Sequence, residues 1–215
     1  MTVTTPANAI TLLGKPTSIN VRKVLWLCAE LNLPVDLQPW GSGQRDTQMP
    51  AFLALNPNGL VPVLRDGDFT LWESNSICRY LAAREQRTDL LPTAPRKRAV
   101  VEQWMDWQTT ELNNAWRYIF MALVREDPAY NDKTAMQNSV ASWNRHMSML
   151  DQQLARTGAF VTGEKFTLAD IVLGLSTCRW ARVPMERPPL HAVAAWLGRL
   201  ATRPGYRQHA ANGMA

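Results

Sequence analysis

The sequence predicts two domains of different class: an α/β domain in residues 1–84, a linker in residues 85–95 and an all-helical domain in residues 96–215. Three observations lead to this fold class. Strand-like and helix-like apolar patterns alternate over the first 84 residues. The segment Leu91-Pro-Thr-Ala-Pro95 then interrupts the patterns with two prolines. Beyond it, apolar residues recur at helical spacing, which is typical of a helical bundle.

Composition is ordinary for a soluble globular chain. The 215 residues are 46% hydrophobic and 19% charged, and the formal charge is a mild +5. One compact basic cluster, Arg96-Lys97-Arg98, has no aromatic residues interleaved with it. Nucleic-acid footprints are usually extended, so we expect this cluster to be a solvated helix start and expect no nucleic-acid partner.

The cysteines and the N-terminus predict a cytoplasmic protein. Cys28, Cys78 and Cys178 lie far apart and form no CxxC pair, which favours reduced thiols. The start of the chain lacks the basic and long apolar regions of a signal peptide. No apolar run approaches the roughly 20 residues that span a membrane. The three histidines are unclustered, so we expect no metal site.

The first domain is expected to open with a βαβ unit. Residues 10–14 form an apolar run that ends in glycine, and apolar side chains recur at helical spacing over residues 21–31. The crossover between the two strands should be right-handed. Asp66-Gly67 later predicts a tight hairpin. The expected strands and helices cover residues 10–14, 21–31, 34–39, 51–55, 61–65, 69–72 and 74–84.

The second domain is expected to contain four main helices. They cover residues 96–125, 132–157, a segment that starts at 167, and 191–202. Thr167 and Asp170 have the spacing of a capping box, so we expect both to be structural.

The first candidate binding segment is Glu73-Ser74, at the start of the helix over residues 74–84. Free N–H groups at a helix N-terminus attract a carboxylate, and the Ser74 hydroxyl can donate to the same group. Glu73 can accept from an ammonium. This segment therefore suits the α-amino acid end of a ligand. The alternative is that Ser74 only caps the helix and that Glu73 only complements its dipole.

The second candidate is Val61-Pro62, at the entrance of a predicted strand. Proline has no N–H and interrupts a strand ladder. If its peptide bond is cis, the Val61 backbone can turn toward an extended peptide and pair with it as a further strand would. The alternative is an ordinary proline at the first position of a strand.

The third candidate is Ser18-Ile19-Asn20, between the first strand and the first helix. Open α/β sheets present ligands beyond the carboxyl ends of their strands. A hydroxyl or amide there can donate to a thiolate and lower its pKa. The alternative is that Ser18 or Asn20 only caps the helix.

In this order, the three segments resemble the cytosolic glutathione S-transferase superfamily. The resemblance rests on strand–Ser-x-Asn–helix, Asn56-Pro-Asn-Gly-Leu-Val-Pro62, Glu-Ser before a helix, and the Thr167–Asp170 box. It extends over nearly the whole chain, about residues 10–204. It implies a thioredoxin-like first domain, an all-helical second domain and a glutathione-binding enzyme of the serine or asparagine type, with a role in detoxification.

The resemblance implies a role for each candidate residue. Val61 would pair with the cysteinyl backbone of glutathione and Pro62 would be cis, while Glu73 and Ser74 would hold the γ-glutamyl end. Ser18 or Asn20 would contact the sulfur; the choice stays open, with Ser18 preferred. The candidates for the glycyl end are Trp40, Gln44, Thr47 and Gln48. The absence of cysteine at position 18 argues against thiol exchange.

The second substrate would be a small hydrophobic electrophile, held in a pocket between the two domains that the long helix lines. The candidates are Trp107, Thr110, Trp116, Arg117 and Trp180. The alternative is that these aromatic residues belong to the bundle core, because aromatics at helical spacing usually pack there. The resemblance also implies a homodimer and no metal.

The main hypothesis is a glutathione transferase that activates the thiol of its cosubstrate. One rival is a glutathione-dependent disulfide reductase, peroxidase or isomerase on the same fold. The other is a non-catalytic glutathione-binding protein of stress response or regulation.

Overall fold

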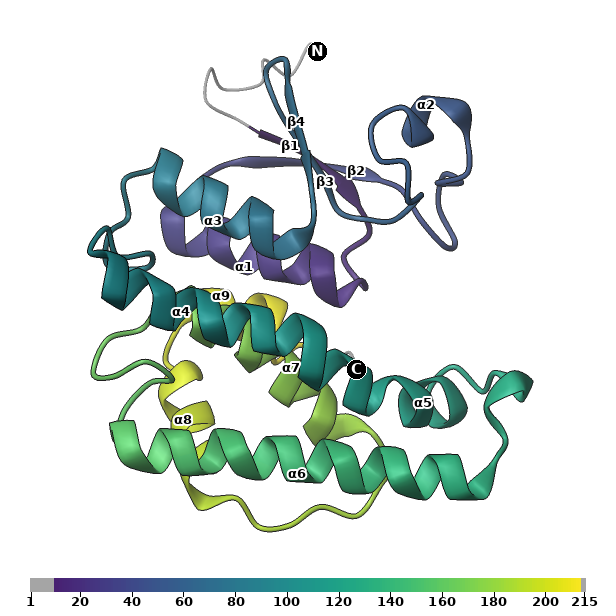
Figure 1. Ribbon diagram of the computed structural model, residues 1–215. Helices are drawn as coiled ribbons and strands as arrows, with labels where there is room; N and C mark the ends of the chain where they lie inside the picture. The colour runs from purple at the N-terminus through teal and green to yellow at the C-terminus, as the bar shows by residue number, and fades with distance from the viewer. Residues whose placement is uncertain (1–9, 214–215) are drawn as a thin grey trace. The chain divides into compact units, whose positions relative to one another are not determined.

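The computed structural model describes residues 10–213, which divide into two compact units (Figure 1). The N-terminal unit ends at Arg87 and the C-terminal unit begins at Thr88. This division falls inside the predicted linker, residues 85–95. The α/β and all-helical classes predicted for the two parts are confirmed.

The N-terminal unit is a four-stranded mixed sheet with the strand order β2-β1-β3-β4. β1 pairs with β2 in parallel and with β3 antiparallel, and β3 pairs with β4 antiparallel. Helices α1 and α3 lie side by side against one face of the sheet (Figure 1). The elements are β1 (Ile10–Gly14), α1 (Ile19–Leu31), β2 (Val35–Pro39), α2 (Pro50–Leu53), β3 (Val63–Asp66), β4 (Phe69–Trp72) and α3 (Ser74–Arg84).

Apolar side chains on both sides of the sheet build the core of this unit. Toward α1 and α3, the fully buried residues include Ile10, Val24 and Ile77. A separate cluster, to which Leu55 and Val61 also contribute, joins the sheet to the segment after β2; its buried members are Leu13, Trp40, Phe52 and Val63. Buried apolar residues thus flank the two central strands, β1 and β3, while β2 and β4 form the edges of the sheet.

Several predicted bounds in this unit differ from the observed ones by one or two residues. The third strand was expected from residue 61 and begins at Val63. Pro62 has no N–H to donate, so the ladder can form only beyond it. Val61 and Pro62 thus lie in the chain that leads into the strand.

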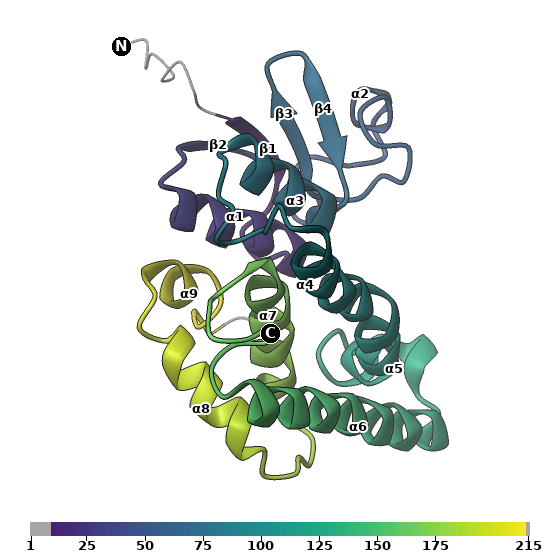
Figure 2. The same ribbon diagram turned by 60° about the vertical axis from the view of Figure 1, so that its left-hand side comes forward.

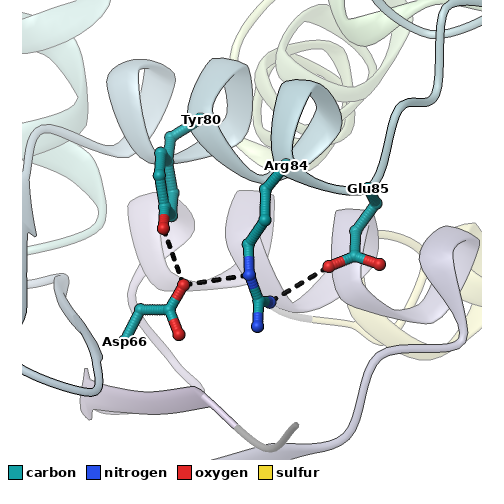
Figure 3. Close-up of polar contacts among 4 residues, drawn as sticks. All are labelled: Asp66, Tyr80, Arg84 and Glu85. Carbon is teal, nitrogen blue, oxygen red and sulfur yellow. Dashed lines mark hydrogen bonds and ion pairs between the residues drawn. The ribbon is translucent and has the colours of Figure 1, made fainter.

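The β3–β4 hairpin is fastened to α3 at its tip (Figure 3). The Tyr80 hydroxyl donates to Asp66 Oδ2 at 2.7 Å, and Arg84 Nε lies 3.0 Å from the same oxygen. Arg84 Nη1 lies 3.0 Å from Glu85 Oε1. The hydrogen bond to Asp66 raises the pKa of Tyr80. This cluster couples the hairpin to α3, the helix that carries Ser74.

The C-terminal unit is helical, and its central helix is α7 (Leu168–Arg182). Every residue from Leu168 to Trp180 is buried, as expected of a helix surrounded by others. Figure 2 shows α7 among its neighbours. The others are α4 (Pro95–Trp107), α5 (Asn113–Leu123), α6 (Lys133–Thr157), α8 (His191–Leu200) and α9 (Pro204–His209).

The long helix predicted over residues 96–125 is interrupted. A π-helix, Gln108–Leu112, joins α4 to α5. Thr109 and Thr110 turn their hydroxyls back to the carbonyls of Met105 and Asp106, both at 3.1 Å. Such bonds compete with the backbone ladder and bend helices. The sequence also missed the short helix α9.

Candidate functional site

The strand register brings the three predicted segments to one end of the sheet. Leu13 near the end of β1 pairs with Val63 at the start of β3, and Val63 pairs with Trp72 at the end of β4. The turn after β1, the chain before β3 and the chain after β4 therefore leave from the same place. We call this place the site end of the sheet. The N-termini of α1 and α3 begin there.

Ser18 and Asn20 lie at the first turn of α1. Ser18 is the N-cap residue with φ −75° and ψ 125°, yet its hydroxyl makes no capping hydrogen bond. Asn20 is the second residue of the helix. Both side chains are half-buried, and neither has a hydrogen-bond partner within residues 10–213. Helix capping therefore does not occupy these groups, and both can donate to a ligand.

The segment before β3 is held by a local network. Asn56 Nδ2 donates to the Leu60 carbonyl at 2.8 Å, and its Oδ1 accepts from the Asn58 backbone N–H at 3.1 Å. Gly59 has φ +62°, which glycine adopts without a Cβ clash. This network fixes the course of the chain directly before Val61.

Val61 is placed with its backbone free. The Val61–Pro62 peptide bond is cis, as expected. The Val61 side chain packs on the cluster that contains Trp40 and Phe52. Its N–H and C=O have no partner among the described residues. One donor and one acceptor thus remain for an extended ligand.

Glu73 has an unusual backbone conformation. It is the N-cap residue of α3 with φ +70° and ψ 111°, and it is exposed. A positive φ at a residue other than glycine is uncommon, costs of order 1–3 kcal/mol and is found preferentially at functional sites. Its carboxylate makes no capping hydrogen bond. Capping thus does not explain this residue.

Ser74 is the first residue of α3 rather than its cap. Its side chain is 6% exposed, and its hydroxyl has no partner in the part of the chain that the structure describes. The first intrahelical bond runs from the Ile77 N–H to the Glu73 carbonyl at 2.9 Å, so the helix ladder does not use the N–H groups of Ser74 and Ser76. Together they can hold a carboxylate.

The site end combines positive helix ends with one carboxylate. The N-termini of α1 and α3 both favour anions. Neither helix has an acidic residue in its first turn. Glu73 supplies a single negative charge beside them. This combination suits a ligand that carries both carboxylates and an ammonium group, and whose reacting atom becomes an anion.

Sequence reasoning missed Lys23 and Asn75. Lys23 is only 2% exposed, and its Nζ donates to Asn75 Oδ1 at 3.2 Å. The bond joins α1 to α3, directly beside Ser74. The sequence gives little signal for this contact, because Arg22 and Lys23 lie outside the apolar positions 21, 24, 25, 28 and 31, where polar residues are ordinary.

The candidates for the glycyl end lie around the segment that follows β2. Trp40 is buried, its ring centroid is 5.0 Å from that of Phe52, and Arg45 lies 5.7 Å above it. Gln48 lies against Gly59, where an added Cβ would be within 2.4 Å of its amide nitrogen. Gln44 is exposed and Thr47 is half-buried. None of these contacts assigns a ligand.

Among the electrophile candidates, Trp116 and Trp180 are tightly packed. The Trp180 indole donates to Asn144 Oδ1 at 2.9 Å, and the side chain is 6% exposed. Trp116 donates to Asn113 Oδ1 at 3.1 Å and lies 4.6 Å beneath the Arg179 guanidinium. Trp180 is therefore a core residue, whereas Trp116 stays half-buried.

Trp107, Thr110 and Arg117 are more open. Thr110 and Arg117 are exposed. Trp107 lines a hollow of about 630 Å³ between α4 and α6, together with Trp104, Met149 and Arg156. Within residues 10–213, no hydrogen bond or ring contact joins any two of the five predicted electrophile residues. The C-terminal unit by itself does not assemble them into one pocket.

The thiols are poor nucleophiles. None of the three cysteines forms a disulfide, and all three are buried. Burial raises the pKa of Cys28 far above its usual range and raises that of Cys78 to about 12. Reactive cysteines need a lowered pKa and some exposure.

Among the described residues, no group of three metal-ligating side chains is present, and no helix is long and apolar enough to cross a membrane.

Comparisons with known proteins identify the same family for both units of the chain. The family model of the glutathione S-transferase N-terminal domain matches residues 17–84, and that of the C-terminal domain matches residues 112–204. The chain is 39% identical to the glutathione S-transferase GstB of Escherichia coli K12 over 201 residues, which is 93% of this chain and 96% of the relative. It is 33% identical to glutathione S-transferase 3 of Zea mays, over 92% of this chain and 91% of the relative.

A solved structure gives the same answer. The chain is similar to a theta class glutathione S-transferase from the citrus canker pathogen Xanthomonas axonopodis pv. citri, with glutathione bound. The TM-score is 0.89 at 36% identity, and the similarity covers 97% of this chain and 100% of the other. A glutathione S-transferase from Pseudomonas fluorescens has a TM-score of 0.80 at 28% identity, over 91% of this chain and 96% of the other.

Proposed function

Because this chain belongs to the cytosolic glutathione S-transferase superfamily, we propose that it binds glutathione at the site end of the sheet and activates the thiol for attack on a hydrophobic electrophile. The observation that carries the proposal is the strand register. It gathers three segments, each with unused hydrogen-bonding groups, at two helix N-termini.

The γ-glutamyl and cysteinyl parts of glutathione meet groups of matching chemistry. The Val61 N–H and C=O pair with the backbone around the cysteinyl residue. The Ser74 hydroxyl and the open N–H groups of α3 hold the γ-glutamyl carboxylate, and Glu73 accepts from the γ-glutamyl ammonium. The Val61 backbone groups, the Ser74 hydroxyl and the Glu73 carboxylate have no partner among the described residues, which supports their use by a ligand.

The thiol is activated at the first turn of α1. A donor at Ser18 or Asn20 and the positive end of the helix both stabilise the thiolate over the thiol, so the pKa falls and the proton passes to solvent. The sulfur then attacks the electrophilic carbon. A C–S bond forms, and the leaving group departs with its electron pair.

Substitution of the two candidate donors tests this mechanism. Ser18→Ala and Asn20→Ala are measured separately for the thiolate absorbance of bound glutathione against pH, and for turnover of a chloronitroaromatic substrate. Loss of a hydrogen bond to an anion costs about 1.5–3 kcal/mol, so the variant that removes the donor should raise the thiol pKa by about 1–2 units. Thr17→Ala, at an exposed neighbour, is the control. Unchanged pKa and rate in both variants would remove the assignment.

Disulfide reduction is not favoured by any side chain at this place, since Ser18 occupies the position of an exchanging thiol and the cysteines are buried.

The homodimer implied by the resemblance also stands as a proposal. Exposed apolar side chains on both units support it, namely Phe69, Trp72, Val100 and Met149. Sedimentation equilibrium at micromolar concentration should give twice the chain mass of 24.2 kDa, and a monomer would contradict it.

A further inference from the structure

We propose that Lys23 is a positioning residue: its buried ammonium ties the first turn of α3 to α1 and so holds the two halves of the glutathione site in register. The inference rests on the proposed function, because it concerns the same site. It adds a residue that does not touch the ligand and acts through Asn75.

The bond joins two elements that are distant in sequence. Lys23 and Asn75 are 52 residues apart, and the Nζ–Oδ1 distance is 3.2 Å. Asn75 is the second residue of α3, directly after Ser74, and is 7% exposed. On α1, Lys23 follows Asn20 by three residues, so the two side chains share one helix face. One bond therefore spans from the helix that carries the sulfur donors to the turn that holds the γ-glutamyl carboxylate.

Burial makes this bond difficult to replace. An ammonium removed from water must be hydrogen-bonded, or it costs several kcal/mol. Water cannot freely substitute for Asn75 at a side chain with so little exposure. The first turn of α3 cannot shift from α1 without weakening the contact. Catalytic groups need placement within about 0.5 Å, so this restraint bears directly on glutathione affinity.

A second contact on α3 shows what a purely structural bond looks like. The Tyr80 hydroxyl binds Asp66 at the hairpin tip (Figure 3), in the later part of the helix. It holds α3 to β3 and does not touch the first turn. Tyr80→Phe is therefore a matched control, which removes one side-chain hydrogen bond from the same helix.

The experiment is a double-mutant cycle on glutathione binding. Lys23→Met keeps the apolar stem and removes the donor, and Asn75→Leu removes the acceptor at similar volume. The dissociation constant of S-methylglutathione is measured by calorimetry for the wild type, both single variants and the double variant. Each single change should weaken binding about tenfold. The double variant should also be weaker by about tenfold rather than about a hundredfold, because the residues act as one unit.

Control measurements separate positioning from stability. Tyr80→Phe should lower the melting temperature and leave the dissociation constant unchanged. If Lys23→Met does not fold, Lys23→Gln, which keeps a donor on a shorter stem, and Asn75→Leu still test the inference. Unchanged affinity in folded variants of Lys23 and Asn75, or a hundredfold loss in the double variant, would overturn it. A wild-type protein that fails to bind S-methylglutathione would instead overturn the proposed function.

Discussion

Asp170 is a carboxylate in the core of the C-terminal unit. It is fully buried, and its Oδ1 accepts from the Val161 N–H and from the Trp196 indole, both at 3.0 Å. Its Oδ2 accepts from the Thr167 N–H at 2.8 Å and from the Thr167 hydroxyl at 3.2 Å. The spacing of Thr167 and Asp170 predicts the cap. It does not predict that the same side chain also anchors the preceding loop and α8.

Burial has the largest effect on the pKa of Asp170. Removal from water raises the pKa of Asp170 to about 6, although its four hydrogen bonds act in the opposite direction. The folded state then binds the proton more tightly than the unfolded chain, whose pKa is 3.8. Between these two values the folded state carries more protons. The contribution of Asp170 to the free energy of unfolding therefore decreases as pH rises from about 4 to about 6, and is constant above.

We predict that Asp170→Asn removes this pH dependence and lowers stability. An amide places a donor where the carboxylate accepts, so at least one buried N–H loses its partner, at a cost of about 1–3 kcal/mol. Urea unfolding of both proteins from pH 4 to pH 8 measures the effect. The stability difference between them should be largest near pH 4. A difference that is constant over this range would contradict the raised pKa.

At the scale of elements, the sequence was sufficient to predict a strand or helix where the apolar pattern and the turn residues beside it agree. The strand Ile10–Gly14 and the helix Ser74–Arg84 were predicted at their observed bounds. The hairpin was also predicted, but Asp66 pairs with Phe69, so the two connecting residues are Gly67 and Asp68. The π-helix Gln108–Leu112 was not predicted. Its apolar spacing is that of a continuous helix, and the difference lies in its backbone bonding, in which the Asn113 N–H donates to the Gln108 carbonyl five residues earlier.

The candidate site divides in the same way. Its three segments could be predicted from the sequence because each carries a local signal. These signals are a helix start, a proline before a strand and a residue that follows a strand. Contacts between elements that are distant in sequence could not be predicted, and the hydrogen bond between Lys23 and Asn75 is the example. Helical spacing also fails to separate core from cleft, so Trp180 was proposed for a pocket although it is buried and bonded to Asn144.

At the scale of the whole molecule, the cysteines provide a reporter in each unit. Cys28 and Cys78 lie in the N-terminal unit and Cys178 lies in the C-terminal unit, all buried. A thiol reagent can reach them only when the surrounding unit opens, and a ligand that binds one unit opposes its opening. A decrease in the labelling rate of a cysteine when the ligand is added therefore indicates that the ligand binds the unit that contains this cysteine.

We predict that S-methylglutathione, which carries no free thiol, slows the labelling of Cys28 and Cys78. If the ligand binds only the folded N-terminal unit, a concentration about 100 times its dissociation constant stabilises that unit by about 2.7 kcal/mol and slows labelling through its global opening about 100-fold. Mass spectrometry of peptides after timed exposure to the reagent gives the rate at each cysteine separately. Fast labelling at Cys28 and Cys78 in saturating ligand, with Cys178 protected instead, would place the binding energy in the helical unit and contradict a site built on β1, β3 and the first turns of α1 and α3.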